Sequence, residues 1–436
     1  MKVLLINSVC GIGSTGRICT DLAQQFEAAG DEVKIAYGRK GTVPEQFQKY
    51  AVRIGTDWDC KMHAIQTRLF DTHGFGSKHA TKKFLQWAEE YKPDLLWLHN
   101  IHGYYINVEM LFDWIKKHPE MQVKWTLHDC WAFTGHCSYC SQLRRYPACY
   151  AMSSVRRNFA RKRAAFTRVP NLTLITPSKW LADLVKQSFL KDYPVEVHYN
   201  TIDTTIFKPT PGDFRERYGL QDKIIVLGVA NVWEVRKGLF DFYKLAEMLD
   251  DRYAIVLVGL SEKQIEDLPK SIKGIQRTNS PQELTAIYTA ADVFVNPSVE
   301  ETFGMTPIEV QACGTPSIVY EDTACAEAAE QTGNKVVPQD VNALYEAITG
   351  EKFMLGGIKH SKMRGCMIVA IPRTNSPQEL AEIYTAANIF ANPTYEDNYP
   401  TVNLEAQACG TKVVTYDTGG CRETLISSLL GQTAFQ

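Results

Sequence analysis

The strongest constraint on the fold is a repeated alternation of short apolar runs with segments of helical periodicity. Five such runs in the first half of the chain begin at Lys2, Glu32, Asp94, Val123 and Leu172. Continuous apolar strands that alternate with helices are typical of a parallel sheet covered on both faces. We therefore expect an α/β domain whose ligands bind at the carboxyl ends of the strands.

A second alternation begins at residues 223–228 and reaches residue 350. The stretch between the two, 201–209, is polar and ends in a proline, which is typical of a domain linker. The chain of 436 residues also exceeds the roughly 250 residues at which single cores stop growing. The sequence thus predicts an N-terminal Rossmann-like domain over 1–209 and a second one over 210–350.

The remaining residues, 351–436, repeat part of the second domain. The segment IQRTNSPQEL at 275–284 recurs as IPRTNSPQEL at 371–380, an offset of 96 residues from 275 to 371. The segment EVQACG at 309–314 recurs as EAQACG at the same offset. Nothing in the tail corresponds to residues 223–250, so we interpret it as a partial duplication of the second domain and not a complete third one.

Composition excludes several classes of protein. The net charge of −2 argues against a nucleic-acid-binding protein that works through a global basic field. No run approaches the about 20 apolar residues that span a bilayer, and the N-terminus reads as a first strand and not as a signal peptide. We therefore expect a cytoplasmic protein whose 12 cysteines are mostly reduced.

One strand-turn-helix in the second domain predicts an anion site. The apolar run 292–297 reads as a buried strand, and Pro307 fits a first helical turn, so a helix is expected over about 306–313. Helix N-termini at strand ends are where α/β sheets hold phosphate. The amides expected to point out of this helix are those of Phe303, Gly304 and Met305.

Two carboxylates, Glu301 and Glu309, flank this predicted anion site. A sugar-nucleotide ligand explains why carboxylates flank an anion site, because its diphosphate suits the amides and its hydroxyls suit the carboxylate acceptors. The spacing by itself favours a surface helix with two solvated glutamates. Arg236 and Lys237, at the mouth of an earlier helix, would complement a diphosphate, and their alternative is plain surface exposure.

Polar and glycine-rich segments end the strands of the first domain. Gly13 and Gly16 lie between the first strand and the first helix, where glycine lets the backbone approach an anion, although a tight structural turn would look the same. Two later strands also end in polar side chains. Taken together these side chains predict a cleft, whereas each of them alone could be a hydrogen-bonded polar group that caps a strand: His99, Asn100, His102 and His128.

Two further segments have open interpretations. The first is a cluster of four cysteines: Cys130, Cys137, Cys140 and Cys149. We interpret them as thiols that pack in the core and not as metal ligands, so no metal is assigned. Residues 155–168 are basic around the apolar positions Val155, Phe159 and Phe166, so this segment fits either contact with an anionic membrane or a solvated helix.

These features together resemble glycosyltransferase family 4. The resemblance covers nearly all of 1–350 and rests on the glycine-rich first loop, His128, the segments 177–181 (PSKWL), 199–203 (YNTID) and 236–238 (RKG), and Glu301 with Glu309. It implies the GT-B architecture, two Rossmann-like parallel-sheet domains facing across a cleft. It also implies retaining transfer of a sugar from a nucleotide donor with no catalytic metal and no cofactor. Among family members, enzymes of bacterial surface-polysaccharide assembly are most similar.

Site roles carry over by position. The resemblance implies that Lys237 and Arg236 hold the donor diphosphate, with Gly13 and Gly16 close to it. It gives the catalytic positions to His128, in the cleft near the reacting carbon, and to Glu301, on the donor sugar. It places Glu309 on the ribose, the amides of 303–305 among the donor contacts, and His99, Asn100 and His102 on the acceptor side.

Some positions depart from the family pattern. Asn231 stands where an arginine is common, and Thr323-Ala324 stands where two glycines are common. The repeat keeps Gly419-Gly420 but has Asp397 and Tyr399-Pro400 in place of the first glutamate and Phe303-Gly304. The repeat also has no Arg-Lys-Gly segment before it, so we assign the site to the first copy.

We therefore expect a hexosyltransferase that moves a sugar to a glycan or a lipid-linked acceptor in polysaccharide biosynthesis. It should work in the cytoplasm or peripherally at the inner face of the membrane, with contact to anionic lipid through 155–168 and no nucleic acid partner. The alternatives are a sugar-nucleotide epimerase or hydrolase of the same fold, and a decayed protein that only binds nucleotide sugars.

Overall fold

The structure is a computed structural model that describes most of the chain. The described residues are 1–39, 41–139, 153–332, 335–350, 376–387, 389–392, 401–415, 422–425 and 431–433. Contacts divide the chain into two compact units, Met1–Met367 and Ile368–Gln436. Each unit is described by itself below.

The first unit begins with a parallel seven-stranded sheet in the order β3-β2-β1-β4-β5-β6-β7. Its strands are β1 (Lys2–Ile6), β2 (Glu32–Tyr37), β3 (Ala51–Arg53), β4 (Leu95–Leu98), β5 (Gln122–Thr126), β6 (Leu172–Thr176) and β7 (Val195–Val197). Side chains alternate between the two faces of a strand, and β1 sends Leu4 and Ile6 into one core and Val3 and Leu5 into another. Both faces of this sheet are therefore covered, as the apolar runs predicted.

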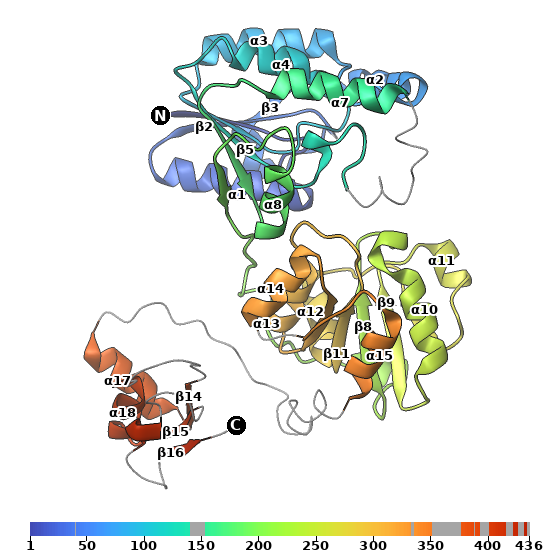
Figure 1. The fold of residues 1–436 in the computed structure, drawn as a ribbon, viewed down its shortest axis with the longest axis vertical. Helices are drawn as coiled ribbons and strands as arrows, with labels where there is room; N and C mark the ends of the chain where they lie inside the picture. Colours follow the sequence, from blue (N-terminus) through green and yellow to red (C-terminus); the bar gives the residue numbers. More distant parts are fainter. Residues whose placement is uncertain are drawn as a thin grey trace. The chain divides into compact units, whose positions relative to one another are not determined.

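Helices on the two faces close these cores. They are α1 (Gly13–Ala28), α2 (Asp57–Phe70), α3 (Lys78–Tyr91), α4 (Val108–Ile115), α7 (Ser153–Phe166) and α8 (Lys179–Lys186), with short 3₁₀ turns at η1 (Glu45–Tyr50) and η2 (Trp131–Phe133). Figure 1 shows α3, α4 and α7 together on one face and α1 on the other. Cys19 and Ala23 of α1 pack in the core to which Val3 and Leu5 belong.

A second parallel sheet of six strands follows, in the order β10-β9-β8-β11-β12-β13. Its strands are β8 (Ile224–Val229), β9 (Tyr253–Val258), β10 (Ile272–Ile275), β11 (Val293–Asn296), β12 (Ser317–Tyr320) and β13 (Lys335–Val337). The helical elements are α9 (Phe214–Tyr218), η3 (Val235–Lys237), α10 (Leu239–Met248), α11 (Glu262–Glu266), α12 (Pro281–Ala290), α13 (Met305–Ala312), α14 (Ala324–Thr332) and α15 (Val341–Thr349). Two parallel-sheet α/β domains are thus confirmed (Figure 1).

The second unit holds a small parallel sheet in the order β14-β15-β16. Its elements are α17 (Pro377–Ala386), β14 (Ile389–Asn392), α18 (Thr401–Ala408), β15 (Lys412–Thr415), η4 (Arg422–Thr424) and β16 (Gly431–Thr433). The helix α17, the strand β14 and the helix α18 each start 96 residues after α12, β11 and α13, from 281 to 377, 293 to 389 and 305 to 401. The order of these elements agrees with the sequence repeat, whereas the predicted boundaries at 209 and 350 stay predictions.

Candidate active site

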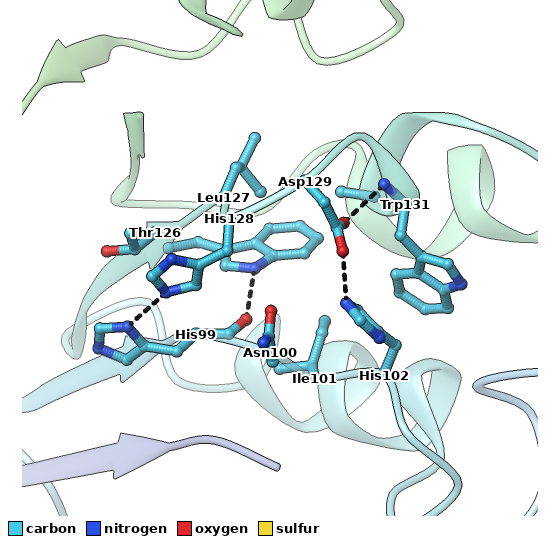
Figure 2. A pocket seen from close by; sticks show the side chains of 11 residues that line it. His99, Asn100, Ile101, His102, Thr126, Leu127, His128, Asp129 and Trp131 are labelled. Carbon is cyan, nitrogen blue, oxygen red and sulfur yellow. Dashed lines mark hydrogen bonds and ion pairs between the residues drawn. The ribbon is translucent and has the colours of Figure 1, made fainter. Parts of the chain in front are cut away.

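Two histidines face each other at the carboxyl edge of the first sheet. His99 follows β4 and His128 follows β5, and their Nδ1 and Nε2 atoms lie 3.1 Å apart with the rings stacked (Figure 2). Burial lowers the pKa of His128 to about 4, and burial together with His128 lowers the pKa of His99 well below its ordinary value. Both rings are therefore neutral at pH 7, with one nitrogen donating to the other.

A second pair, His102 and Asp129, lies beside the first. His102 Nε2 is 3.0 Å from Asp129 Oδ2, and the amide of Trp131 donates to Asp129 Oδ1 at 2.9 Å (Figure 2). Burial acts to raise the pKa of Asp129, but His102 and the Trp131 amide outweigh it and hold that pKa below its ordinary value. The carboxylate is therefore ionised and positioned at the end of β5.

These two pairs line a small hollow. Its walls include His99, Asn100, His102, His128, Asp129 and Trp131. His99 Nε2 is buried and has no hydrogen-bond partner within the described part of the chain, so it is available to a hydroxyl group of a ligand. The predicted acceptor-side residues and His128 are thus brought together in one place.

The glycine-rich turn adjoins this hollow through Asn100. The amide of Asn100 donates to Asn7 Oδ1 at 3.2 Å, and its Nδ2 atom donates to Thr15 Oγ1 at 3.4 Å. Gly13 opens α1 with φ of 67°, and no atom lies within 4 Å of the position that a Cβ would take there. A Cβ at Gly16 would come 3.1 Å from Val9 Cγ2, so Gly16 serves packing while Gly13 leaves open space before the helix N-terminus.

On the second sheet, Arg236 and Lys237 form the 3₁₀ turn η3 between β8 and α10. The Lys237 ammonium forms an ion pair with Glu301, and Arg236 lies 3.6 Å from the same carboxylate. Arg236 also donates to the carbonyl of Glu300 at 2.6 Å, and its guanidinium lies 3.9 Å from the ring centre of Tyr139. Two of the predicted diphosphate ligands therefore converge on the predicted sugar ligand.

This cluster is largely withdrawn from water. Burial, and after it the neighbouring Arg236, lowers the pKa of Lys237 to about 8, while Cys325 and Glu234 act in the opposite direction. Lys237 also lines a small hollow together with Asn296 and Ser298. An anionic ligand that entered this hollow would meet a cation at the wall.

The helix α13 begins at Met305, one residue before the position expected from Pro307. Gly304 precedes it with φ of 82°, and a Cβ at this position would collide with Cys325 Sγ, so only glycine fits. Phe303 is buried, with its ring centre 6.2 Å from that of Tyr199. The first-turn amides of α13 have no acceptor within the helix, as the predicted anion site requires.

Glu309 has contacts different from those of Glu301. It lies within α13, and the hydroxyl of Tyr288 on α12 donates to its Oε2 atom at 3.0 Å. Burial raises the pKa of Glu309 above its ordinary value, and the hydrogen bond from Tyr288 acts in the opposite direction. The structure therefore pairs Glu301 with cations and Glu309 with a neutral donor.

The loop that carries Glu301 reaches the end of β5. Thr302 Oγ1 donates to the carbonyl of His128 at 2.9 Å, and Ser178 Oγ donates to the carbonyl of Thr302 at 2.8 Å. Glu301 thus immediately precedes a residue bonded to His128. The two predicted catalytic positions are joined through Thr302, although 173 residues separate them, from 128 to 301.

Several residues around the site escaped the sequence reasoning. They are Thr302, Tyr139 over Arg236, Trp131 in the hollow, and Tyr288 on Glu309. Only Tyr288 left a signal in the sequence, because it recurs as Tyr384 in the repeat. There Tyr384 bonds to Glu405, and burial and Glu405 raise the pKa of the Tyr384 phenol.

The other open motifs have the following outcomes. Cys130 and Cys137 are buried, whereas Cys140 and Cys149 lie outside the described residues. Among the residues that the structure describes, no group of three or more His, Cys, Asp or Glu side chains could hold a metal ion. No helix within the described ranges is both long enough and apolar enough to span a membrane.

The departures from the family pattern also have places in the structure. Asn231 is exposed and Thr323 is buried, with its hydroxyl accepting from the Cys325 amide at 3.2 Å. In the repeat, Asp397 and the segments 399–400 and 419–420 lie outside the described residues.

Two segments match protein-family models described as glycosyl transferases group 1, residues 223–350 and residues 367–431. Alpha-galactosylglucosyldiacylglycerol synthase of Streptococcus pneumoniae is 28% identical over 171 residues, which is 36% of this chain and 45% of that protein. A Campylobacter jejuni enzyme, N,N'-diacetylbacillosaminyl-diphospho-undecaprenol alpha-1,3-N-acetylgalactosaminyltransferase, is 30% identical over 121 residues, 26% of this chain and 31% of that protein. The chain spans half or less of the length of the curated relatives it matches.

Solved structures agree with the two-domain architecture. Sucrose-phosphate synthase from Thermosynechococcus elongatus superposes with a TM-score of 0.58 at 18% identity and covers 82% of this chain and 90% of that one. Anabaena HepE in complex with UDP superposes with a TM-score of 0.55 at 17% identity and covers 80% of this chain and 89% of that one. At these identities the likeness establishes the fold alone.

Proposed function

The chain is a member of the group 1 glycosyltransferases with the GT-B fold, and from this premise we propose that it transfers a hexose from a nucleotide-sugar donor, with retention of configuration. One observation carries the proposal. Lys237 and Arg236 converge on Glu301, and the next residue, Thr302, bonds to the end of β5 at His128. Cations for a diphosphate and acceptors for sugar hydroxyls are thus assembled beside a hollow lined by histidines.

Each group has a part in the proposed reaction. Lys237, Arg236 and the N-terminus of α13 bind the donor diphosphate and stabilise the charge that develops when it leaves the anomeric carbon. Glu309 accepts from the ribose hydroxyls, and Glu301 accepts from the sugar. The acceptor oxygen enters on the face that the diphosphate leaves, next to His128, and retention follows from that shared face.

Gly13 and the acceptor-side histidines complete the proposed site. The open space beside Gly13 would leave room for the diphosphate at the N-terminus of α1, and Gly16 would hold the turn in shape. His99, Asn100 and His102 bind the acceptor, because they line the hollow beside His128. The attacking hydroxyl would donate a hydrogen bond to the ionised Asp129 carboxylate or to His99 Nε2, which accepts in one of the two neutral tautomers of the ring.

We propose a glycan or a lipid-linked acceptor, and a role in polysaccharide or glycolipid biosynthesis in the cytoplasm at the inner face of the membrane. The names of the Streptococcus and Campylobacter relatives, a diacylglycerol glycoside synthase and an undecaprenol-linked transferase, support this acceptor class. The basic segment 155–168 was expected to contact anionic lipid. Val155 and Phe166 are buried, whereas Phe159 is 37% exposed, so this segment offers its basic side chains and one apolar ring.

A thermal-shift screen against UDP-, GDP- and ADP-sugars tests the donor, and UDP-glucose is the first choice because HepE was solved with it. We expect one base to raise the melting temperature of the chain and not that of Lys237→Ala. No shift with any nucleotide sugar would contradict a donor site. Incubating the donor without an acceptor and finding a free epimer would favour the epimerase alternative, which the matched glycosyltransferase relatives make less favourable.

A further inference from the structure

The helix α2 (Asp57–Phe70) exposes an apolar stripe to solvent. The fractional exposures are 68% for Trp58, 45% for Met62, 48% for Ile65 and 69% for Leu69. Their spacings of four, three and four residues place all of them on one face of the helix. Phe70, at the end of the helix, is 62% exposed and extends the apolar surface, which we call the α2 face.

This helix is inverted with respect to an ordinary surface helix. A surface helix normally turns its apolar stripe to the core and its polar side to water. In α2 the inward side instead carries His63, which is buried and bonded to Ser77 Oγ at 2.9 Å, and Thr67, whose buried hydroxyl has no partner among the described residues. Exposing contiguous apolar side chains while burying polar ones is unfavourable for an isolated protein and indicates a binding surface.

Basic side chains adjoin the α2 face. Arg157 of α7 donates to the carbonyl of Phe70 at 2.9 Å, and Asn158 donates to the carbonyl of Asp71 at 2.6 Å, so the end of α2 meets the start of α7. Figure 1 shows α2 and α7 next to each other at this end of the first sheet. The exposed cations on these two helices are Lys61, Arg68, Arg156, Arg157 and Arg163.

The carboxylates of α2 do not offset this charge. Asp57 forms an ion pair with Arg53, and Asp59 closes the capping box with Thr56 at the first turn. Both groups lie at the N-terminal end of the helix, away from the contact with α7. The α2 face is therefore apolar at its centre and cationic at the edge next to α7.

We propose that the α2 face docks on the surface of a bilayer that contains anionic lipids. Trp58, Met62, Ile65 and Leu69 enter the boundary between headgroups and acyl chains, and the arginines of α7 pair with lipid phosphates. The cationic edge favours an anionic lipid surface over a second copy, because a second copy would present the same cations and no complementary negative charge. On this proposal the α2 face supplies most of the apolar membrane contact, since Val155 and Phe166 of the segment 155–168 are buried and only Phe159 of its three apolar positions is exposed.

Docking through α2 would also place the hollow near the lipid. The helix leads directly into the segment that carries His73, whose ring centre lies 5.8 Å from that of His102 and 5.5 Å from that of Trp131. A lipid-linked acceptor would then need to leave the bilayer by only a short distance. This last consequence rests on the proposed function, whereas the docking itself does not.

Co-sedimentation of the full chain with vesicles tests the proposal without any substrate. We expect binding to vesicles in which about a third of the lipid is phosphatidylglycerol, weak binding to phosphatidylcholine alone, and loss of binding at high salt. Trp58→Ser/Leu69→Ser and Arg156→Glu/Arg157→Glu should each weaken binding by about tenfold or more. A matched control, Phe240→Ser/Lys244→Glu, removes one exposed aromatic and reverses one exposed charge on α10 and should bind like the wild type.

A spectroscopic test is independent of affinity. Lipids brominated near the headgroup should quench the fluorescence of the bound wild type more than that of Trp58→Phe, which should still bind. Equal quenching, equal vesicle binding by the two α2 and α7 variants, or binding without dependence on anionic lipid would overturn the proposal. So would light scattering that shows a dimer in the wild type and a monomer in Trp58→Ser/Leu69→Ser, since the α2 face would then join two copies.

Discussion

Lys237 and Glu301 form a direct ion pair although 64 residues of sequence separate them. The lysine precedes α10 and the glutamate follows β11, so the pair spans two neighbouring strands of one sheet. The glutamate offers Lys237 the kind of negative charge that a diphosphate would also bring. We therefore expect that a bound donor diphosphate would replace Glu301 as the partner of the Lys237 ammonium.

Removing the lysine should therefore affect both activity and stability. Lys237→Ala should lower the transfer rate more than tenfold, the loss expected for one charge-assisted contact worth about 1.5–3 kcal/mol. It should also destabilise the free protein, because Glu301 keeps only Arg236 at 3.6 Å. Adding Glu301→Gln should recover stability in urea unfolding but not activity, and Lys244→Ala on the exposed side of α10 should change neither. Full activity of Lys237→Ala would remove this residue from the site.

Glu309→Gln should weaken donor binding and yet stabilise the free protein at neutral pH. Burial raises the pKa of Glu309 above 4.5, so the folded chain holds its proton more tightly than the unfolded chain. The contribution of this group to stability therefore falls as pH rises above about 4.5, and glutamine removes that loss. Calorimetry with the donor should show a drop in affinity of more than tenfold, and melting temperatures at pH 7 should rise. Glu405→Gln, at the equivalent and exposed position of the repeat, is the matched control.

Acid should destabilise the protein through His128. Its pKa is lowered from 6.5 to about 4, so between these values the unfolded chain binds more protons than the folded one. Stability due to this group is complete above pH 6.5 and is lost as the pH falls toward 4. Urea midpoints measured across this range should fall less steeply for His128→Asn than for the wild type. His63, with a pKa also lowered to about 4, should account for part of the remaining slope.

Truncation after residue 350 should leave a folded chain that binds the donor. Every residue of the candidate site precedes this point, and the unit 368–436 has its own small core around Tyr384 and Val413. The melting temperature and the donor affinity of the shortened chain should match those of the full chain. A truncated chain that aggregates or loses donor binding would mean that the repeat supports the site.

Sequence patterns predicted the elements that depend on local chemistry. The apolar runs predicted most of the strands of both sheets, and Pro307 predicted the start of α13 to within one residue. The histidines that end two strands did meet at one edge, because adjacent parallel strands bring their carboxyl ends together. Short strands such as β3 and β10, of three and four residues, escaped prediction because so few residues carry little periodicity.

Contacts made by tertiary structure could not be read in this way. Nothing near Thr302 in the sequence indicates that its hydroxyl bonds to the His128 carbonyl, since the two come from different sheets. The orientation of α2 is a second example. Apolar residues at helical spacing, here Trp58, Met62, Ile65 and Leu69, normally face a core, whereas the structure turns these side chains outward. Periodicity identifies a face of a helix but not what covers it.

The paired tyrosine and glutamate of the second domain have a consequence for folding. Tyr288 with Glu309 and Tyr384 with Glu405 are made by segments of nearly the same sequence, and β14 (IFAN) resembles β11 (VFVN). During folding, both segments are therefore candidates for the central place beside β8. The repeat thus offers a second segment that fits the place of β11, and we expect that any such mispairing must be undone before the native sheet forms, which would slow folding of the full chain relative to a chain truncated after residue 350.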